Sequence, residues 1–179
     1  MQVALIIIAI IIIYWLMKED SGFAFSEEIA KKVYNKWNNL ALKYDAVAFP
    51  KNSLVSVVDI LAIIAVESAG NEKAIGDKGK SLGLMQVGKL ALIDVNRSLG
   101  TNYTFEDLLI PEINVLVGSH YLQLCFKQAV KERAKDIRYL GYRKYNAGIG
   151  RATEKNNISK RYANKVMEYR RYFENLIRK

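Results

Sequence analysis

The sequence predicts a mainly α domain that is preceded by one N-terminal transmembrane helix. Residues 3–17 carry no charge, and most of the later chain shows apolar residues at helical spacing. No segment shows the strict alternation of apolar and polar residues that indicates a strand. Of the 179 residues, 51% are hydrophobic and 25% charged, which is a globular composition. Without the apolar N-terminus about 155 residues remain, enough for one domain with a real core.

Residues 1–18 form the predicted transmembrane anchor. The uncharged run VALIIIAIIIIYWLM would span about 22 Å as a helix, so flanking residues must extend it to cross a hydrocarbon layer of about 30 Å. No Lys or Arg precedes the run and no small-residue cleavage site follows it, which favours a retained anchor over a cleaved signal peptide. Mixed charges after the run leave its orientation open.

Residues 19–52 are interpreted as a joint and a leading helix. Ser26 with Glu27 and Glu28 resembles a helix start, and apolar spacing continues to about Tyr44. Residues 53–179 form the main domain. Its first helix, residues 54–69, is apolar nearly all round and is expected to be buried, with Ser53 as its cap.

The remaining elements follow from turn and cap signals. Residues 71–88 contain four glycines and are expected to form a loop or a small hairpin. Helices are predicted over residues 89–99, 113–130, 137–146 and 159–177. Thr104 and Asp107 resemble a capping box, with Asp where Glu or Gln is usual.

The balance of charged residues indicates which classes of partner the chain can bind. Lys and Arg outnumber Asp and Glu by 27 to 18, for a net charge of +9. This balance favours an acidic polymer or an anionic lipid, and a solvated basic surface would also explain it. No zinc-finger spacing, aromatic RNA-binding motif or Gly-rich phosphate loop is present. We therefore expect no nucleic acid, no metal and no cofactor.

Glu67 is the candidate catalytic residue, because it is the only charged residue near the end of an apolar helix. Ile60, Ile63 and Ile64 share its helix face. Burial and the negative end of the helix dipole should both raise its pKa. A carboxyl group that stays protonated near neutral pH is the acid that glycosidic cleavage requires. The alternative is a Glu at a helix end that turns out to water.

Five stretches between about residues 52 and 173 carry a family resemblance. They are AIIAVES at 62–68, GLMQV at 83–87, NVLVGSHYL at 114–122, YNAG at 145–148 and YANKV at 162–166. Their order and spacing resemble those of the lytic transglycosylases and goose-type lysozymes, which share a lysozyme-like α fold. The resemblance implies that residues 53–179 are a lysozyme-like catalytic domain acting on the glycan strands of peptidoglycan.

The resemblance also implies roles for individual residues. Glu67 would act first as acid and then as base, and Ser68 would support the turn after it. Met85 and Gln86 would contact the sugar at the cut, although Met85 also fits a plain core position. Tyr145 would orient Glu67, although a packed aromatic residue is the alternative for this position. Asn146 would bind polar groups of the sugar.

The expected product depends on a second carboxylate. Goose-type lysozymes carry aspartates that are thought to position water, and Asp77 stands in the stretch that resembles the first of these. Gly88 stands where the second is expected. Many transglycosylases carry a serine in this loop, and Ser81 is only a loose equivalent. We therefore expect a lytic transglycosylase that leaves 1,6-anhydromuramic ends. The alternatives are a hydrolytic muramidase and a non-catalytic wall-binding structural protein.

The partners expected from these patterns are peptidoglycan glycan strands and, through residues 1–18, a lipid bilayer. The chain would be a single-pass membrane protein whose catalytic domain faces the wall, in the periplasm or at the cell exterior. A bacterial envelope machine that opens the wall and the virion of a membrane-containing phage both suit this arrangement.

Overall fold

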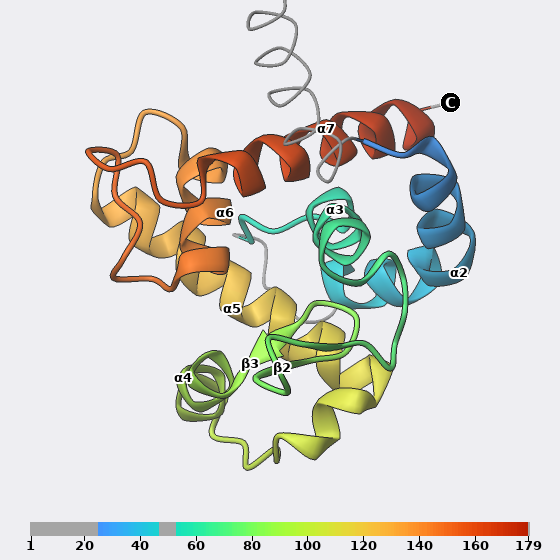
Figure 1. The fold of residues 1–179 in the computed structure, drawn as a ribbon. Helices are drawn as coiled ribbons and strands as arrows, with labels where there is room; N and C mark the ends of the chain where they lie inside the picture. The colour runs from blue at the N-terminus through green and yellow to red at the C-terminus, as the bar shows by residue number, and fades with distance from the viewer. Residues whose placement is uncertain (1–24, 47–52, 179) are drawn as a thin grey trace, which may run out of the picture.

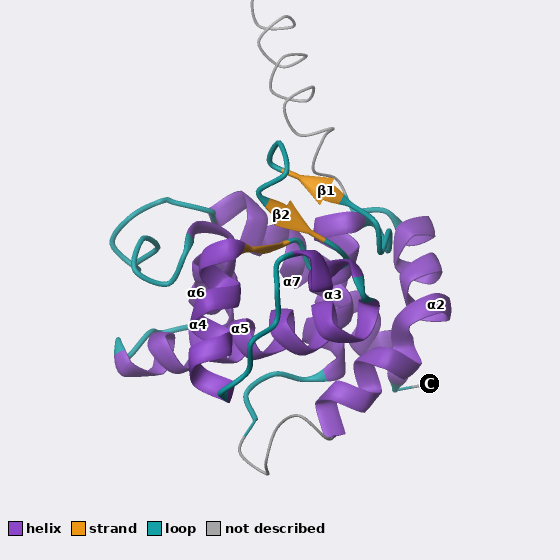
Figure 2. Ribbon diagram, turned by 90° about the horizontal axis from the view of Figure 1, so that it is seen from below, coloured by secondary structure: helices purple, strands orange, loops and turns teal. Residues whose placement is uncertain are grey.

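The computed structural model describes residues 25–46 and 53–178 as a mainly α domain with one small sheet (Figure 1, Figure 2). The helices predicted within these residues are confirmed in type and order, with ends that differ by a few residues. In chain order the elements are α2 (Glu27–Ala46), α3 (Val57–Ser68), β1 (Ile75–Gly76), β2 (Ser81–Leu82), β3 (Val87–Gly88), α4 (Lys89–Leu99), the 3-10 helix η1 (Glu106–Leu109), α5 (Pro111–Lys131), α6 (Ile137–Ala147) and α7 (Lys160–Ile177).

Helix α3 lies at the centre of the core, as its apolar surface predicts. Every residue from 57 to 65 is buried, and the helix packs against α2 on one side and α7 on the other (Figure 1). The long helix α5 packs against α6 and α4. The leading helix α2 shares this core, because its stripe Ala30, Val33, Trp37 and Ala41 is buried in it.

The start of α3 differs from the prediction. Ser53 was expected to cap the helix, but its hydroxyl bonds within a tight turn, to the N–H and the carbonyl of Val55. The cap lies three residues later, at Ser56, and the helix begins at Val57. The Asp59 carboxylate accepts hydrogen bonds from the Ser56 backbone N–H at 2.8 Å and from its hydroxyl at 2.7 Å. The acidic residue of the first turn therefore selects the helix start.

The glycine-rich segment forms a three-stranded antiparallel sheet in the order β1-β2-β3. The register pairs Ile75 with Leu82 and Leu82 with Val87. Each strand has only two residues, too few for alternation to be visible in the sequence. The sheet rests on α5 at Gly118, where an added Cβ would lie 2.6 Å from the Met85 sulfur.

The predicted capping box of Thr104 and Asp107 is confirmed. The Thr104 N–H donates to the Asp107 carboxylate at 2.8 Å, and the Asp107 N–H donates back to the Thr104 hydroxyl at 3.3 Å. This reciprocal box lies at the start of η1.

Within residues 25–46 and 53–178, no helix has both the length and the apolar composition needed to cross a membrane. The predicted anchor, residues 1–18, lies outside these residues.

Candidate active site

Glu67 lies in the last turn of α3, where the helix leaves the core. The residues before it are buried, whereas Glu67 and its immediate neighbours are half-buried. The helix stops directly afterwards, because Ala69 and Gly70 both adopt the left-handed backbone conformation, with φ of 50° and 78°. The carboxyl group is therefore held at the boundary between the apolar core and the surface.

The Glu67 carboxyl group has a direct hydrogen-bond donor. The phenol of Tyr162, in the first turn of α7, donates to Glu67 Oε1 at 2.7 Å. Tyr162 is only 8% exposed. Burial, together with the nearby negative charge of Glu67, holds the pKa of Tyr162 well above its ordinary value, so this phenol remains protonated. It thus supplies a permanent donor to Glu67.

Burial raises the pKa of Glu67 from its ordinary value of 4.5 to about 7. The hydrogen bond from Tyr162 opposes this shift by favouring the ionised form. The negative charge of Asp77 raises the pKa further, and the positive charge of Lys165 lowers it. The net result is a carboxyl group that can both give and accept a proton near neutral pH.

Asp77 stands in the turn between β1 and β2. Asp77, Lys78 and Gly79 all adopt left-handed backbone conformations, with φ of 48°, 56° and 86°. The carbonyl of Gly76 closes the turn by accepting from the N–H groups of Gly79 and Lys80 at 2.9 and 3.1 Å. The Asp77 side chain is exposed, and its charge still reaches Glu67.

The side chain of Gln86 braces the same sheet. Its amide nitrogen donates to the carbonyls of Ala74 at 3.0 Å and Gly83 at 2.9 Å, and its amide oxygen accepts from the Ser81 hydroxyl at 2.9 Å. The polar atoms expected to bind sugar are therefore engaged within the protein. A contact between Gln86 and the sugar remains a prediction.

Met85 is fully buried, at 0% exposed. Its N–H donates to the Asn114 side chain at 2.8 Å, and its carbonyl accepts from the Tyr145 phenol at 2.8 Å. These contacts fit the core position that the sequence left open for Met85. Its side chain has no exposed surface with which to contact a sugar in this structure.

Tyr145 and Asn146 end α6 beside the sheet. The Tyr145 ring packs against Tyr121 with a centroid distance of 5.5 Å. Tyr145 lies near enough to Glu67 for that charge to raise its pKa, after the larger effect of burial. Its hydroxyl nevertheless bonds to Met85, so the residue bonded to Glu67 is Tyr162. Asn146 is exposed, and its amide oxygen accepts from the Ser159 hydroxyl at 2.6 Å.

These elements enclose a pocket of about 490 Å³, here called the main pocket. It lies between the sheet, the start of α4 and the end of α6. Asp77 and Tyr145 line it, and both interact electrostatically with Glu67. We therefore place Glu67 at its border. The other lining residues are Gly79, Lys80, Ser81, Gln86, Gly88, Lys89, Leu90, Ala91, Tyr121, Asn146, Ala147 and Gly148.

The remaining predicted residue, Ser68, is half-buried, and its hydroxyl donates to the Ile64 carbonyl at 3.3 Å. This bond lies within the last turn of α3. Sequence reasoning gave no role to Tyr162, although the stretch YANKV that contains it was noted. Nothing local in that stretch reveals that Tyr162 meets a residue 95 positions earlier.

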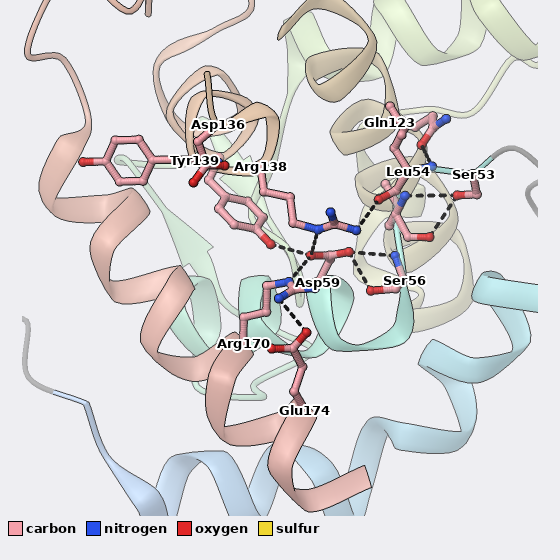
Figure 3. Close-up of polar contacts among 12 residues, drawn as sticks. Ser53, Leu54, Ser56, Asp59, Gln123, Asp136, Arg138, Tyr139, Arg170 and Glu174 are labelled. Atoms are coloured by element: carbon pink, nitrogen blue, oxygen red, sulfur yellow. Dashed lines mark hydrogen bonds and ion pairs between the residues drawn. The ribbon is translucent and has the colours of Figure 1, made fainter. Parts of the chain in front are cut away.

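Sequence reasoning also overlooked Asp59, a second carboxylate on α3. It is fully buried and accepts from Arg170 Nε at 2.9 Å and from the Tyr142 phenol (Figure 3). The guanidinium of Arg138 lies 3.5 Å away. Asp59 therefore joins α3 to α6 and α7. These two helices carry Tyr145 and Tyr162. The contacts of Asp59 therefore fix the positions of both tyrosines relative to α3, which carries Glu67.

The sequence model of the family described as "Transglycosylase SLT domain" matches residues 50–168. Among solved structures, an inactive mutant of the lytic transglycosylase Slt from Pseudomonas aeruginosa matches with a TM-score of 0.48 and 21% sequence identity. That match covers 86% of this chain and 23% of the other, so the chain spans less than a quarter of that protein's length. No curated protein matches the chain.

Proposed function

The chain belongs to the transglycosylase SLT domain family, and on this premise we propose that it is a peptidoglycan lytic transglycosylase. It cleaves the β-1,4 bond between N-acetylmuramic acid and N-acetylglucosamine. The observation that carries the proposal is the state of Glu67. Its carboxyl group has a pKa of about 7 and accepts a hydrogen bond from Tyr162, and it interacts electrostatically with Asp77 and Tyr145, which line the main pocket.

The proposed reaction uses Glu67 twice. The protonated carboxyl group first donates its proton to the glycosidic oxygen, and the bond from this oxygen to the muramic acid carbon breaks. The resulting carboxylate then accepts the proton of the muramic acid C6 hydroxyl, whose oxygen bonds to the same carbon. One proton is given and one is recovered, and no water is consumed. The hydrogen bond from Tyr162 favours the intermediate carboxylate.

The alternative product is a reducing end formed by water. Asp77 favours this alternative, because it lines the main pocket and its charge acts on Glu67. Most glycosidases need a second carboxylate to activate water or to form a covalent intermediate. The position where a second water-positioning aspartate is expected holds Gly88. An intramolecular hydroxyl has a high effective concentration, so it should compete well against water held by a single aspartate.

We further propose that residues 1–18 anchor this domain in a membrane, with Glu67 on the side that faces the wall. The uncharged run at residues 3–17 supports the anchor. An anchored wall-cutting domain suits local wall opening, either by a bacterial envelope machine or by a membrane-containing phage during entry. Cell fractionation, followed by protease treatment of intact and broken spheroplasts, would test both the anchoring and the side.

The enzymatic proposal is tested by a zymogram in which peptidoglycan is embedded in the gel. Wild-type protein should clear a band, and Glu67→Gln should not, because the amide is nearly isosteric with the acid but donates no proton to the leaving oxygen. A non-catalytic wall-binding protein would bind peptidoglycan without clearing it. If the Glu67→Gln protein clears the gel at more than a few per cent of the wild-type rate, Glu67 is not the catalytic acid.

A further inference from the structure

Two neighbouring basic residues of α6 are buried. Arg143 is 2% exposed and Lys144 is 0% exposed. A buried charge destabilises a fold unless hydrogen bonds and a partner compensate for the lost water. Among the described residues, the lining of the main pocket includes neither of them. Most of their acceptors lie in residues 148–159, the segment that joins α6 to α7 and is here called the α6–α7 loop (Figure 1).

Lys144 holds the first half of the α6–α7 loop. Its ammonium group donates to the carbonyls of Ile149 at 2.9 Å and Ala152 at 2.7 Å. It also donates to the carboxylate of Glu132, directly after α5, at 2.9 Å. These three acceptors match the three N–H groups of an ammonium. Lys144 therefore ties the part of the loop that follows α6 to the end of α5.

Arg143 holds the second half of the loop, which leads into α7. Its Nε donates to the Ile158 carbonyl at 2.8 Å. One of its terminal nitrogens donates to the backbone carbonyl of Asn156 at 2.7 Å and to the side-chain oxygen of the same residue at 2.8 Å. A planar guanidinium fixes the direction of such bonds as well as their length. Arg143 therefore holds the backbone up to the residue before Ser159, the N-cap residue of α7.

The first turn of α7 depends on this support, because it carries Tyr162. The Ser159 hydroxyl bonds to α6 and does not cap α7, and helix ends without a side-chain cap fray. The buried contact between Asp59 and Arg170 holds α7 eight residues after Tyr162, about 12 Å along the helix. Tyr162 follows Ser159 by only three residues, and its phenol donates to Glu67. The position of this donor therefore depends on how the chain enters α7.

We propose that Arg143 is a positioning residue for the acid: by holding the α6–α7 loop at residues 156–158, it keeps the Tyr162 phenol within hydrogen-bonding distance of Glu67. This inference rests on the proposed function, in which Tyr162 favours the carboxylate form of Glu67. Arg143 acts through Tyr162 and takes part in no bond of the reaction.

The pKa of Glu67 reports the position of the Tyr162 phenol. Tyr162 and Lys165 on α7 lower this pKa, whereas burial and Asp77 in the turn between β1 and β2 raise it. Tyr145, at the end of α6, also lies near this charge and stays protonated. Lys165 lies in the next turn of α7, towards Arg170, and Asp77 lies beside the sheet, so we expect both to keep their effect. Loss of the Tyr162 bond alone should therefore raise the pKa and move the alkaline limb of the rate profile to higher pH.

The test measures initial rates of the full-length protein in detergent, on soluble glycan strands, from pH 5 to 9. Arg143→Met should move the alkaline limb to higher pH by roughly half a unit to one unit and lower the maximal rate about threefold to tenfold. Arg143→Lys keeps the charge without the planar fork, so its shift should be measurable but smaller. Circular dichroism checks that each variant folds, and Arg143→Lys decides if Arg143→Met does not. An alkaline limb at the wild-type position would overturn the inference.

A double variant separates positioning from a general loosening of the fold. Because Arg143 acts through Tyr162, adding Arg143→Met (or Arg143→Lys) to Tyr162→Phe should move the alkaline limb no further than Tyr162→Phe alone. Additive shifts would mean that the two residues act separately, and the inference would be wrong.

Lys144→Met is the matched control, because it removes a neighbouring buried cation that holds the half of the loop farther along the chain from Tyr162. It should lower the free energy of unfolding and leave the alkaline limb in place. Glu132→Gln removes the carboxylate bonded to Lys144 and serves as the control if Lys144→Met does not fold. A limb that moves as far in the control as in the Arg143 variants would overturn the inference. A wild-type protein that cuts no glycan strand would instead contradict the proposed function.

Discussion

At the scale of single residues, the environment of Glu67 decides what its carboxyl group can do. Burial favours the neutral acid, and the Tyr162 phenol favours the carboxylate. Their balance puts the pKa at about 7, where one group can serve as acid and then as base. The acid must be protonated when the reaction starts, so the rate should fall as the pH rises through this value.

The first prediction concerns Tyr162→Phe. This change removes the donor to Glu67 Oε1, so the pKa of Glu67 should rise above its wild-type value. The alkaline limb of the rate profile should move to higher pH by roughly one unit, while the maximal rate falls about tenfold because the carboxylate is less well stabilised. Initial rates from pH 5 to 9 on soluble glycan strands measure both effects. An alkaline limb at the wild-type position would mean that Tyr162 does not act on Glu67.

The second prediction concerns Asp77→Asn. The charge of Asp77 raises the pKa of Glu67, so its removal should move the alkaline limb slightly to lower pH. The rate itself should fall only a few-fold, far less than the loss of roughly 10²-fold or more expected for removal of a general acid. Rate measurements on Asp77→Asn and Glu67→Gln side by side check this. Equally severe losses would assign Asp77 to water activation.

At the scale of elements, the buried Asp59 cluster holds α3, α6 and α7 in register (Figure 3). The third prediction is that Asp59→Asn lowers the free energy of unfolding by about 3–5 kcal/mol, because the mostly buried guanidinium of Arg170 loses its fully buried anionic partner. Urea unfolding followed by circular dichroism gives the value. Glu174 also pairs with Arg170, at 2.7 Å, and the matched Glu174→Gln variant should lose much less because that carboxylate is partly exposed. If both variants lose the same free energy of unfolding, the burial of Asp59 does not account for its contribution to stability.

The helices were predictable because each carries a local signal. Helix α4 was predicted with its observed bounds, since glycines stand on both sides of it. The start of α3 was placed three residues early, because Ser53 and Ser56 are both plausible caps and only Asp59 distinguishes them. The strands were not predictable as strands, because two residues carry no period.

Only those features of the site that depend on residues close together in the sequence were predictable. Glu67 was identified from the apolar helix around it and from the family motifs. Its partner Tyr162 was not, because that hydrogen bond joins α3 to α7. The engagement of the Gln86 amide and the burial of Met85 likewise depend on how the sheet folds onto α5. Contacts between distant segments determine these features, and spacing along the chain does not encode them.

At the scale of the whole molecule, the described domain carries all the residues of the candidate site. The fourth prediction is that deleting residues 1–18 yields a soluble protein that still cuts isolated peptidoglycan, because the site lies between residues 67 and 162. The full-length protein should require detergent. Sedimentation after detergent removal, with turbidity assays on both forms, tests this. Full-length protein that stays soluble and monomeric without detergent would contradict the anchor.

The fifth prediction concerns the product, and it tests the central claim most directly. Isolated peptidoglycan is digested with wild-type protein, and the released fragments are weighed by mass spectrometry. If Glu67 acts alone as acid and base, the fragments should carry 1,6-anhydromuramic ends and be lighter than reducing fragments by one water molecule. Asp77→Asn should give the same fragments, and Glu67→Gln should give none. A wild-type digest dominated by the heavier, reducing fragments would contradict the account and make the protein a hydrolytic muramidase.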